Sequence, residues 1–345
     1  IGCNICTSGD NTSVPMRCSQ NPTLGEEWRR GWHPERIAAL DAPAPVLVIG
    51  GGPAGLEAAR AMAARGAEVT LAEGGQEWGG RVAREARLPG LAAWGRVRDW
   101  RLGQLRHDPK VQMFLQSPLS AEDVLGFGLP HVALATGARW RRDGVGRSHR
   151  LPLPWLGDVL TPDDIMAGAT LPEGPAVIFD DDWYYMGSLM AEIALQAGRE
   201  VHFVTADSMV GSFSQHTLEQ GRIQARLIER GARITVAKRL AGRGADWLDL
   251  ACVYTGRTER IACATLISVT ARLPEDRLWH DLQARRSDWA AAGLLSVSRI
   301  GDCLAPGTIA AANYAGHLYA RDFGAPQGEI PFRREDIAQL YPVQA

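Results

Sequence analysis

A strand, a glycine-rich turn, a helix and a second strand follow one another early in this chain, and this order constrains its fold most strongly. Val46-Leu-Val-Ile is a short, wholly apolar run, as expected of a strand that is buried on both faces. After the turn, residues 56–65 are alanine-rich and helical in pattern, and Gly66 ends the helix. A second strand follows at 68–73. Together they predict a βαβ unit of a doubly wound sheet.

The turn of this unit carries the spacing G-x-G-x-x-G at Gly50, Gly52 and Gly55. The first glycine permits a tight turn, the second lets the backbone approach a pyrophosphate, and the third lets helix and strand pack closely. Glu73 ends the second strand, where a carboxylate accepts from both ribose hydroxyls and disfavours a 2′-phosphate. In this context the motif predicts a dinucleotide site; glycines that serve an ordinary turn are the alternative.

The same order of elements returns later in the chain. Residues 176–179 have the pattern of a buried strand, 186–197 that of a helix ended by Gly198, and 201–205 that of another strand. The two openings lie about 130 residues apart. We therefore predict an α/β chain with two doubly wound nucleotide-binding domains.

The turn of the second unit differs from the first, because it reads Asp180-Asp-Asp-Trp-Tyr-Tyr-Met-Gly. Three carboxylates would repel a pyrophosphate, and three aromatic side chains would block the close backbone approach that glycine allows. We expect this domain to bind no nicotinamide nucleotide and to serve as a scaffold or docking surface. Trp183 and Tyr184 either pack at an interface or belong to the core.

Three cysteines near the start of the chain predict a metal site. Cys3, Cys6 and Cys18 have the spacing C-x2-C-x11-C, and a cysteine one position before Ile1 would give C-x2-C-x2-C-x11-C. Four thiolates at such spacings are typical of a [4Fe–4S] cluster. The chain also does not begin with Met, so we expect it to be the C-terminal part of a longer protein. A structural zinc held by the three cysteines and His33 is the alternative.

Length and composition set wider bounds. A chain of 345 residues has room for two domains, and a net charge of −2 gives no reason to propose nucleic acid or a membrane as partner. No apolar stretch is long enough to cross a bilayer. Six cysteines in this length are no disulfide framework, which favours the cytoplasm. No set of residues for hydrolysis stands out, so we assign no catalytic residue.

Three further segments resemble the flavin domain of glutathione-reductase-like proteins. They are Gly79-Gly80-Arg81, the strand-plus-ATG segment 132–138, and Gly301-Asp302. In those proteins the last aspartate contacts a ribitol; here it could instead cap a helix near 308–312. The residues expected to contact the cofactor are Gly50, Gly52, Pro53, Ala54, Gly55, Glu73, Gly80, Arg81, Thr136, Gly137 and Asp302. The expected parts are an irregular iron–sulfur segment and linker (1–40), an ADP- or FAD-type domain (41–165 and 290–345) and an altered NAD(P)-type domain (166–289).

Nearly the whole chain resembles one family. The segments 1–6, 18–23, 25–35, 46–55, 88–91, 135–140 and 301–302 are similar to the C-terminal half of trimethylamine and dimethylamine dehydrogenases. Histamine dehydrogenase and N-methyl-amino-acid demethylases share this build, and 2,4-dienoyl-CoA reductase is a more distant relative. The resemblance implies an upstream (β/α)8 barrel, absent here, which carries FMN and the substrate pocket. It also implies that Cys3, Cys6 and Cys18 are ligands of the [4Fe–4S] cluster.

The resemblance further implies a function for this half of the protein. Electrons from a small amine or N-methylated compound, oxidatively demethylated or deaminated, pass from FMN through the cluster to an acceptor such as an electron-transferring flavoprotein. A homodimer is also implied. The first domain holds ADP in the amine dehydrogenases and FAD in the dienoyl-CoA reductase, and the altered second turn favours ADP. Arg96 stands where the trimethylamine enzyme has an exposed tyrosine near its docking surface. The alternatives are an NAD(P)H-dependent FAD reductase and a non-catalytic nucleotide-binding module with zinc.

Overall fold

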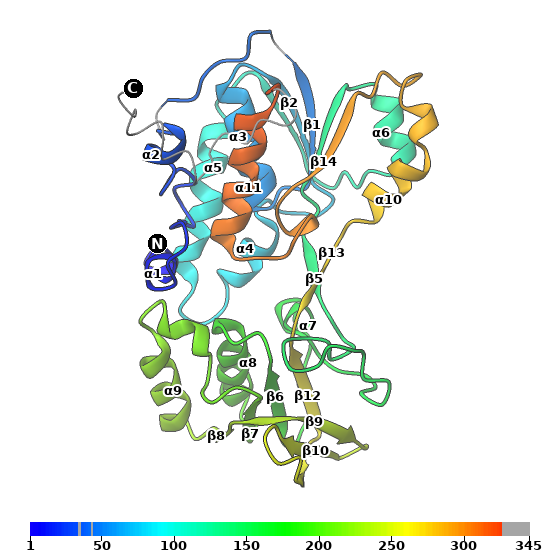
Figure 1. The fold of residues 1–345 in the computed structure, drawn as a ribbon. Coiled ribbons are helices and arrows are strands. Elements are labelled where there is room, and N and C mark those ends of the chain that lie inside the picture. The colour runs from blue at the N-terminus through cyan, green and yellow to red at the C-terminus, as the bar shows by residue number, and fades with distance from the viewer. Residues whose placement is uncertain (34–35, 43, 326–345) are drawn as a thin grey trace, which may run out of the picture.

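The structure is a computed structural model, and it describes residues 1–325 except 34, 35 and 43. Figure 1 shows two α/β domains, one above the other, with the β5–β13 ribbon between them. In the described part, no helix is long and apolar enough to cross a membrane. The last part of the predicted first-domain range, 326–345, lies outside the described residues.

The upper domain is built on a five-stranded parallel sheet with the order β14-β4-β1-β2-β3. Its strands are β1 (Pro45–Ile49), β2 (Glu68–Ala72), β3 (Val111–Phe114), β4 (His131–Leu134) and β14 (Ser296–Arg299). Val46 and Val48 pack in the core cluster of α3 (Pro53–Ala64) and α11 (Ile309–Asp322), whereas Leu47 and Ile49 pack on the side of α6 (Ala121–Phe127). Burial on both faces explains the wholly apolar strand. The predicted βαβ unit is therefore confirmed.

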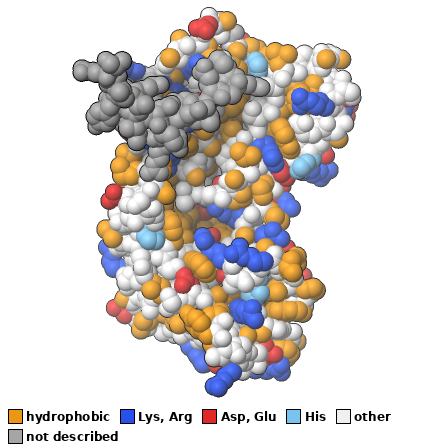
Figure 2. All heavy atoms as spheres, viewed as in Figure 1, with side chains coloured by type: hydrophobic (Ala, Val, Ile, Leu, Met, Phe, Trp, Pro, Cys, Tyr) orange, Lys and Arg blue, Asp and Glu red, His pale blue; other side chains and the backbone are white. Residues whose placement is uncertain are grey.

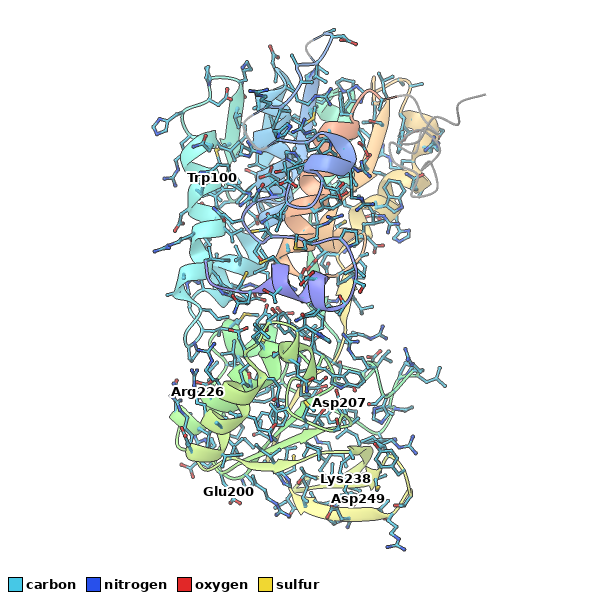
Figure 3. The ribbon with its side chains drawn as sticks, turned by 60° about the vertical axis from the view of Figure 1, so that its left-hand side comes forward. Trp100, Glu200, Asp207, Arg226, Lys238 and Asp249 are labelled. Carbon is cyan, nitrogen blue, oxygen red and sulfur yellow. The ribbon has the colours of Figure 1, made fainter. Side chains whose placement is uncertain are left out.

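The lower domain has a four-stranded parallel sheet with the order β12-β6-β7-β8. Its elements are β6 (Ala176–Asp180), α8 (Tyr185–Gln196), β7 (Val201–Thr205), α9 (Gln220–Glu229), β8 (Arg233–Thr235) and β12 (Thr265–Val269). Ile178 and Phe203 face α8, whereas Val177 and Phe179 face a second, antiparallel sheet. That sheet consists of β9 (Lys238–Arg243), β10 (Trp247–Cys252) and β11 (Thr258–Ala262), and Figure 3 labels Lys238 and Asp249 on it.

The remaining elements link the two domains or cover them. β5 (Ala138–Trp140) and β13 (Arg272–Pro274) pair antiparallel between the domains. The other helices are α1 (Ile5–Asn11), α2 (Glu27–Arg30), α4 (Gly80–Glu85), α5 (Arg96–Leu105), α7 (Pro162–Met166) and α10 (Arg277–Ala284). Among the described residues, four short 3₁₀ turns are η1 (Ala92–Gly95), η2 (Ser212–Gln215), η3 (Arg286–Asp288) and η4 (Gly301–Cys303). In Figure 2, Lys and Arg side chains gather around the hollow between the domains.

The N-terminal segment joins both domains. The segment is not wholly irregular, because it contains α1 and α2. The side-chain amides of Asn4 and Asn11 donate to the backbone oxygens of Thr217 and His216 in the lower domain, at 3.1 and 3.2 Å. Asn313 on α11 donates to the backbone oxygen of residue 19. These bonds fix the cysteine-containing segment against the seam between the domains.

A buried ion cluster holds three helices of the upper domain together. Glu57 on α3 accepts from Arg101 Nε on α5 at 2.8 Å, and the side chains of both residues are fully buried. His317 Nδ1 on α11 lies 2.8 Å from the other oxygen of the same carboxylate, and Arg60 contacts it as well. Burial alone would raise the pKa of Glu57, but Arg101 and Arg60 hold it well below its usual range.

Candidate nucleotide site

A cavity of about 780 Å³ lies beyond the carboxyl ends of β1, β2 and β4. This is the edge at which open α/β sheets bind ligands. All the predicted cofactor contacts except Gly55 line it, namely Gly50, Gly52, Pro53, Ala54, Glu73, Gly80, Arg81, Thr136, Gly137 and Asp302. The structure therefore brings these residues together, and their contacts with a cofactor remain a prediction.

The three glycines of the turn have different surroundings. Gly50 has φ 108°, and a Cβ added there would lie 2.3 Å from the backbone oxygen of Ala135. A Cβ on Gly55 would lie 1.8 Å from the oxygen of Gly50, so Gly55 serves packing and does not border the cavity. A Cβ on Gly52 would meet no atom within 4 Å. Open space at this cavity-lining glycine, at the N-terminus of α3, fits a pyrophosphate.

Backbone hydrogen bonds orient the carboxylate of Glu73. Its Oε2 accepts from the backbone N–H of Gly51 at 2.7 Å, and its Oε1 accepts from that of Gly75 at 2.6 Å. Each carboxylate oxygen has a second lone pair. Glu73 therefore retains the capacity to accept from two ribose hydroxyls.

An ion cluster closes the opposite end of the cavity. Asp302 Oδ2 lies 2.6 Å from Arg272 Nη1 and 3.2 Å from Arg81 Nη1, and Oδ1 accepts from the N–H of Gly307 at 2.9 Å. Burial raises the pKa of this carboxyl, while Arg81 opposes the rise. The open alternative of a helix cap is wrong, because Thr308 caps α11. Both Asp302 oxygens already have partners.

Sequence reasoning missed part of the cavity wall. Residues 117–120 follow β3, and Arg277, Leu278 and Asp281 come from α10. The first group could have been found by placing β3, because the carboxyl ends of parallel strands share one edge. The second group reaches the cavity through the long-range pairing of β13 with β5 and has no local signal.

The corresponding turn of the lower domain is filled by its own side chains. Asp180 Oδ1 accepts from the backbone N–H groups of Asp182 and Trp183 at 3.2 and 3.1 Å. A Cβ on Gly187 would lie 2.6 Å from Asp180 Cγ. Burial raises the pKa of Asp180 well above its usual range and that of Asp182 to about 6. The turn is therefore less negative than three ionised carboxylates would be. It would repel a pyrophosphate less strongly than predicted, whereas the obstruction by side chains remains.

One tyrosine of that turn, Tyr185, contacts the upper domain. Tyr185 donates its hydroxyl hydrogen to Glu85 Oε2 on α4 at 2.9 Å, and its ring centroid lies 4.8 Å from that of Trp94. The Tyr184 ring packs edge-on against that of Tyr185 at 4.6 Å. The Tyr184 ring contacts Tyr185 and Phe213 of its own domain and also lines the space between the domains, so both alternatives stay open.

The three N-terminal cysteines have free, half-buried thiols. Cys3 Sγ lies 3.4 Å from Ser19 Oγ, and the neighbouring Cys18 accepts from the N–H of Gln20 at 3.3 Å, whereas Cys6 lies on α1. Within the described residues, no group of three or more His, Cys, Asp or Glu side chains is arranged to hold a metal. Thiols are the donors that an iron–sulfur cluster requires. The cysteine chemistry therefore fits such a cluster, while the ligand geometry is not assembled.

Comparisons with known proteins agree with this architecture. The model of an NAD(P)-binding Rossmann-like domain matches residues 48–121. Together with the parallel sheets, it defines the chain as one with a Rossmann-like, nucleotide-binding type of domain.

Individual relatives narrow this class. Histamine dehydrogenase from Rhizobium sp. 4-9 is 50% identical with a TM-score of 0.93, over 97% of this chain and 52% of that one. 6-Hydroxypseudooxynicotine amine oxidase from Pseudomonas geniculata N1 is 45% identical with a TM-score of 0.89, over 93% and 48%. Dimethylamine dehydrogenase from Hyphomicrobium sp. (strain x) is 36% identical over 98% of this chain and 50% of its own length. The chain belongs to the trimethylamine/dimethylamine dehydrogenase family, and it spans about half the length of these relatives.

Proposed function

We propose that this chain is the electron-transfer half of an iron–sulfur flavoprotein that oxidises a small amine or N-methylated compound. The observation that carries the proposal is the match of almost the whole chain to amine dehydrogenases and an amine oxidase at 36–50% identity. FMN and the substrate then belong to the preceding half. An external acceptor, such as an electron-transferring flavoprotein, a homodimeric assembly and a cytoplasmic location are part of the same proposal.

The nucleotide of the first domain is proposed to be ADP. The cavity of about 780 Å³ offers the open glycine turn and the oriented Glu73 carboxylate to a pyrophosphate and a ribose. The Arg81–Asp302–Arg272 cluster stands where the cavity would have to continue for a longer ligand. A flavin extension would have to break these ion pairs, whereas ADP leaves them intact.

Cys3, Cys6 and Cys18 are the residues that would hold a [4Fe–4S] cluster, with a fourth thiolate from outside this chain. When bound, such a cluster supplies one-electron transfer. The side chains of Asn4 and Asn11, bonded to the lower domain, would hold the ligand-bearing segment in place.

Chemical analysis of the full-length protein tests both assignments. Denaturation followed by mass spectrometry should release ADP and FMN in equal amounts, and iron and acid-labile sulfide should each amount to about four per chain. FAD in place of ADP, or zinc in place of iron, would contradict the proposal. Stopped-flow mixing with NADPH should leave the flavin oxidised, and rapid bleaching would favour the reductase alternative.

A further inference from the structure

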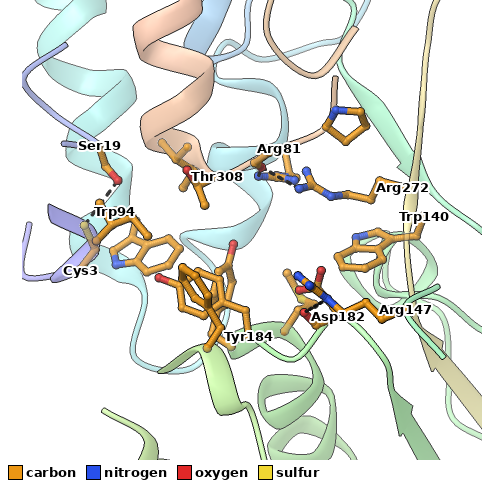
Figure 4. A pocket seen from close by; sticks show the side chains of 17 residues that line it. Cys3, Ser19, Arg81, Trp94, Trp140, Arg147, Asp182, Tyr184, Arg272 and Thr308 are labelled. Carbon is orange, nitrogen blue, oxygen red and sulfur yellow. Dashed lines mark hydrogen bonds between the residues drawn. The ribbon is translucent and has the colours of Figure 1, made fainter. Parts of the chain in front are cut away.

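A second, smaller cavity of about 180 Å³ lies between the domains, on the far side of the Arg81–Asp302–Arg272 cluster. We propose that it binds a monocyclic aromatic carboxylate, in addition to the nucleotide of the larger cavity. Figure 4 shows Trp140 and Arg147 on one side of this space, and Trp94 and Tyr184 on the other. The inference goes beyond the proposed amine oxidation and does not depend on it.

An unpaired donor marks one wall. The Trp140 side chain lines the cavity and is only 5% exposed, and its Nε1–H has no hydrogen-bond partner among the described residues. A buried donor without a partner costs about 1–3 kcal/mol. This nitrogen is covered in the structure, so the indole has to turn slightly before an acceptor on a bound ligand can remove this cost.

Guanidinium groups, each with a carboxylate nearby, border the same end. Arg147 uses its Nε to donate to the backbone oxygen of Asp182 at 3.2 Å, and its terminal nitrogens have no hydrogen-bond partner in the described part. Arg272 lies with its Cζ 5.6 Å from the Trp140 ring centroid. The N-terminus of the 14-residue helix α11 also borders the cavity through Thr308 and Ile309. Guanidinium groups and a helix N-terminus favour an anion.

Aromatic side chains form much of the other walls, beside Cys3, Ile5 and Ser19 of the N-terminal segment, and they select a flat ligand. Tyr184, Tyr185, Trp94 and Phe213 line the space, and their rings offer faces and edges for stacking. A cavity of about 150 Å³ is known to hold benzene. The volume here therefore suits a single ring with a small substituent and excludes a dinucleotide.

One carboxylate, Asp182, opposes an anion in the described wall. It lies beside Arg147, so the pair contributes little net charge when both are ionised. The charges of Arg81 and Arg272 are offset by Asp302 and Glu85. Replacing Asp182 by Asn should therefore tighten the binding of an anion, whereas it should weaken that of a cation. This opposite sign separates the two ligand classes.

Calorimetric titration of the full-length, ADP-saturated protein with sodium benzoate tests the proposal. We expect saturable binding that Trp140→Phe and Arg147→Gln each weaken about tenfold, because each removes a hydrogen bond to a charged group. Asp182→Asn should strengthen binding several-fold. Trp247→Phe and Arg286→Gln, on surfaces away from the cavity, serve as controls and should leave binding unchanged.

The location is checked by a crystal of the same protein with 4-bromobenzoate, whose bromine gives an anomalous signal. A peak between Trp140 and Tyr184 supports the proposal. Absence of benzoate binding, a peak only elsewhere, or benzoate affinity that Trp140→Phe leaves unchanged would overturn it. Benzylamine is a cation, so Asp182→Asn should weaken its binding. A benzylamine affinity that rises in Asp182→Asn would also overturn the proposal. Trp140→Phe removes the N–H together with the five-membered ring of the indole and keeps one aromatic ring, so it remains informative if Arg147→Gln does not fold.

Discussion

The turns after β1 and β6 hold equivalent places in two similar parallel sheets, yet they treat a ligand in opposite ways. After β1, an added side-chain atom on Gly52 would meet nothing within 4 Å, and the space opens into a large cavity. After β6, the side chain of Asp180 folds back over the turn and accepts two of its N–H groups. A βαβ frame therefore survives when protein groups replace the ligand. The turn can therefore support the fold of the βαβ unit without leaving space for a nucleotide.

The helices that follow the two turns differ in a parallel way. Glu57 on α3 is paired with the fully buried Arg101. Glu192 on α8 is also buried, but its partners Arg226 and Arg230 are about half exposed, at 3.3 and 3.5 Å. Figure 3 labels Arg226 on the outer surface of the lower domain. The upper helix thus depends on one buried charge, and the lower helix does not.

The largest expected effect on stability tests this contrast between Glu57 on α3 and Glu192 on α8. Glu57→Gln leaves the buried guanidinium of Arg101 without a counter-charge and should lower the free energy of unfolding by about 3–5 kcal/mol. Glu192→Gln, the matched control, should cost about 1 kcal/mol or less, because water screens its partners. Urea unfolding at pH 7 measures both. Equal losses would show that burial of Arg101 does not distinguish the helices.

The same pair has a pH dependence with a defined sign. The pKa of folded Glu57 lies below that of an unfolded glutamate, so its stabilisation is present above about pH 4.3 and is lost as the pH falls further. Glu57→Gln should therefore show a shallower loss of stability on acidification than the wild type.

The next effect concerns the glycine that packs helix against turn. Gly55→Ala places a methyl group on the backbone oxygen of Gly50 and should destabilise the fold by about 3 kcal/mol. Gly103→Ala, in the exposed interior of α5 with nothing within 4 Å, should instead stabilise the fold by about 1 kcal/mol. Thermal unfolding of both variants gives the comparison. A stable Gly55→Ala variant would mean that the turn can shift.

A smaller effect separates binding from folding at the open turn. Glu73→Ala should weaken ADP binding about tenfold or more, because it removes charge-assisted hydrogen bonds to the ribose. Glu68→Ala, at the exposed start of β2, should bind like the wild type. Calorimetric titration of nucleotide-depleted protein measures both affinities. An unchanged affinity in Glu73→Ala would remove the ribose role of this residue.

The smallest effect concerns the filled turn. Asp180→Asn should change stability by less than about 1 kcal/mol near pH 4, since the buried wild-type carboxyl is protonated there. The raised pKa means that the wild type loses stability as the pH rises from the unfolded value towards the folded one. The variant should therefore gain on the wild type between pH 4 and pH 8. Urea unfolding at both pH values checks this, and parallel curves would show that Asp180 is ionised.

Local patterns predicted what is local. The apolar run of β1, the glycine spacing and the alanine-rich α3 lie within a few turns of chain, and the structure places them as expected. β3 was missed because its four residues alternate between half-buried and exposed. The sheet β9–β11 was missed because it owes its burial to Val177 and Phe179, which lie far away in sequence.

In the candidate site, too, local features could be predicted from the sequence and long-range ones could not. Its glycines and Glu73 could be found because each acts on backbone close to it in sequence. The pairing of Asp302 with Arg272 and Arg81 could not be found from the sequence. Charged residues occur throughout the chain, and the sequence does not show which of them pair when they lie 30 or more residues apart. The charge state of Asp180 also escaped, since it is set by burial and not by residue type.

The edge position of β14 has a consequence for how the protein is made. β14 and α11 complete the upper sheet and cover α3, yet the whole lower domain precedes them in the chain. During synthesis, the upper domain thus cannot complete its sheet until the lower domain has left the ribosome. The contact between Glu57 and His317 cannot form before then either. Chains that terminate early would expose Leu47, Val132 and their neighbours, a surface that chaperones and proteases recognise. The interleaved order therefore makes completion of translation a condition for a closed nucleotide domain.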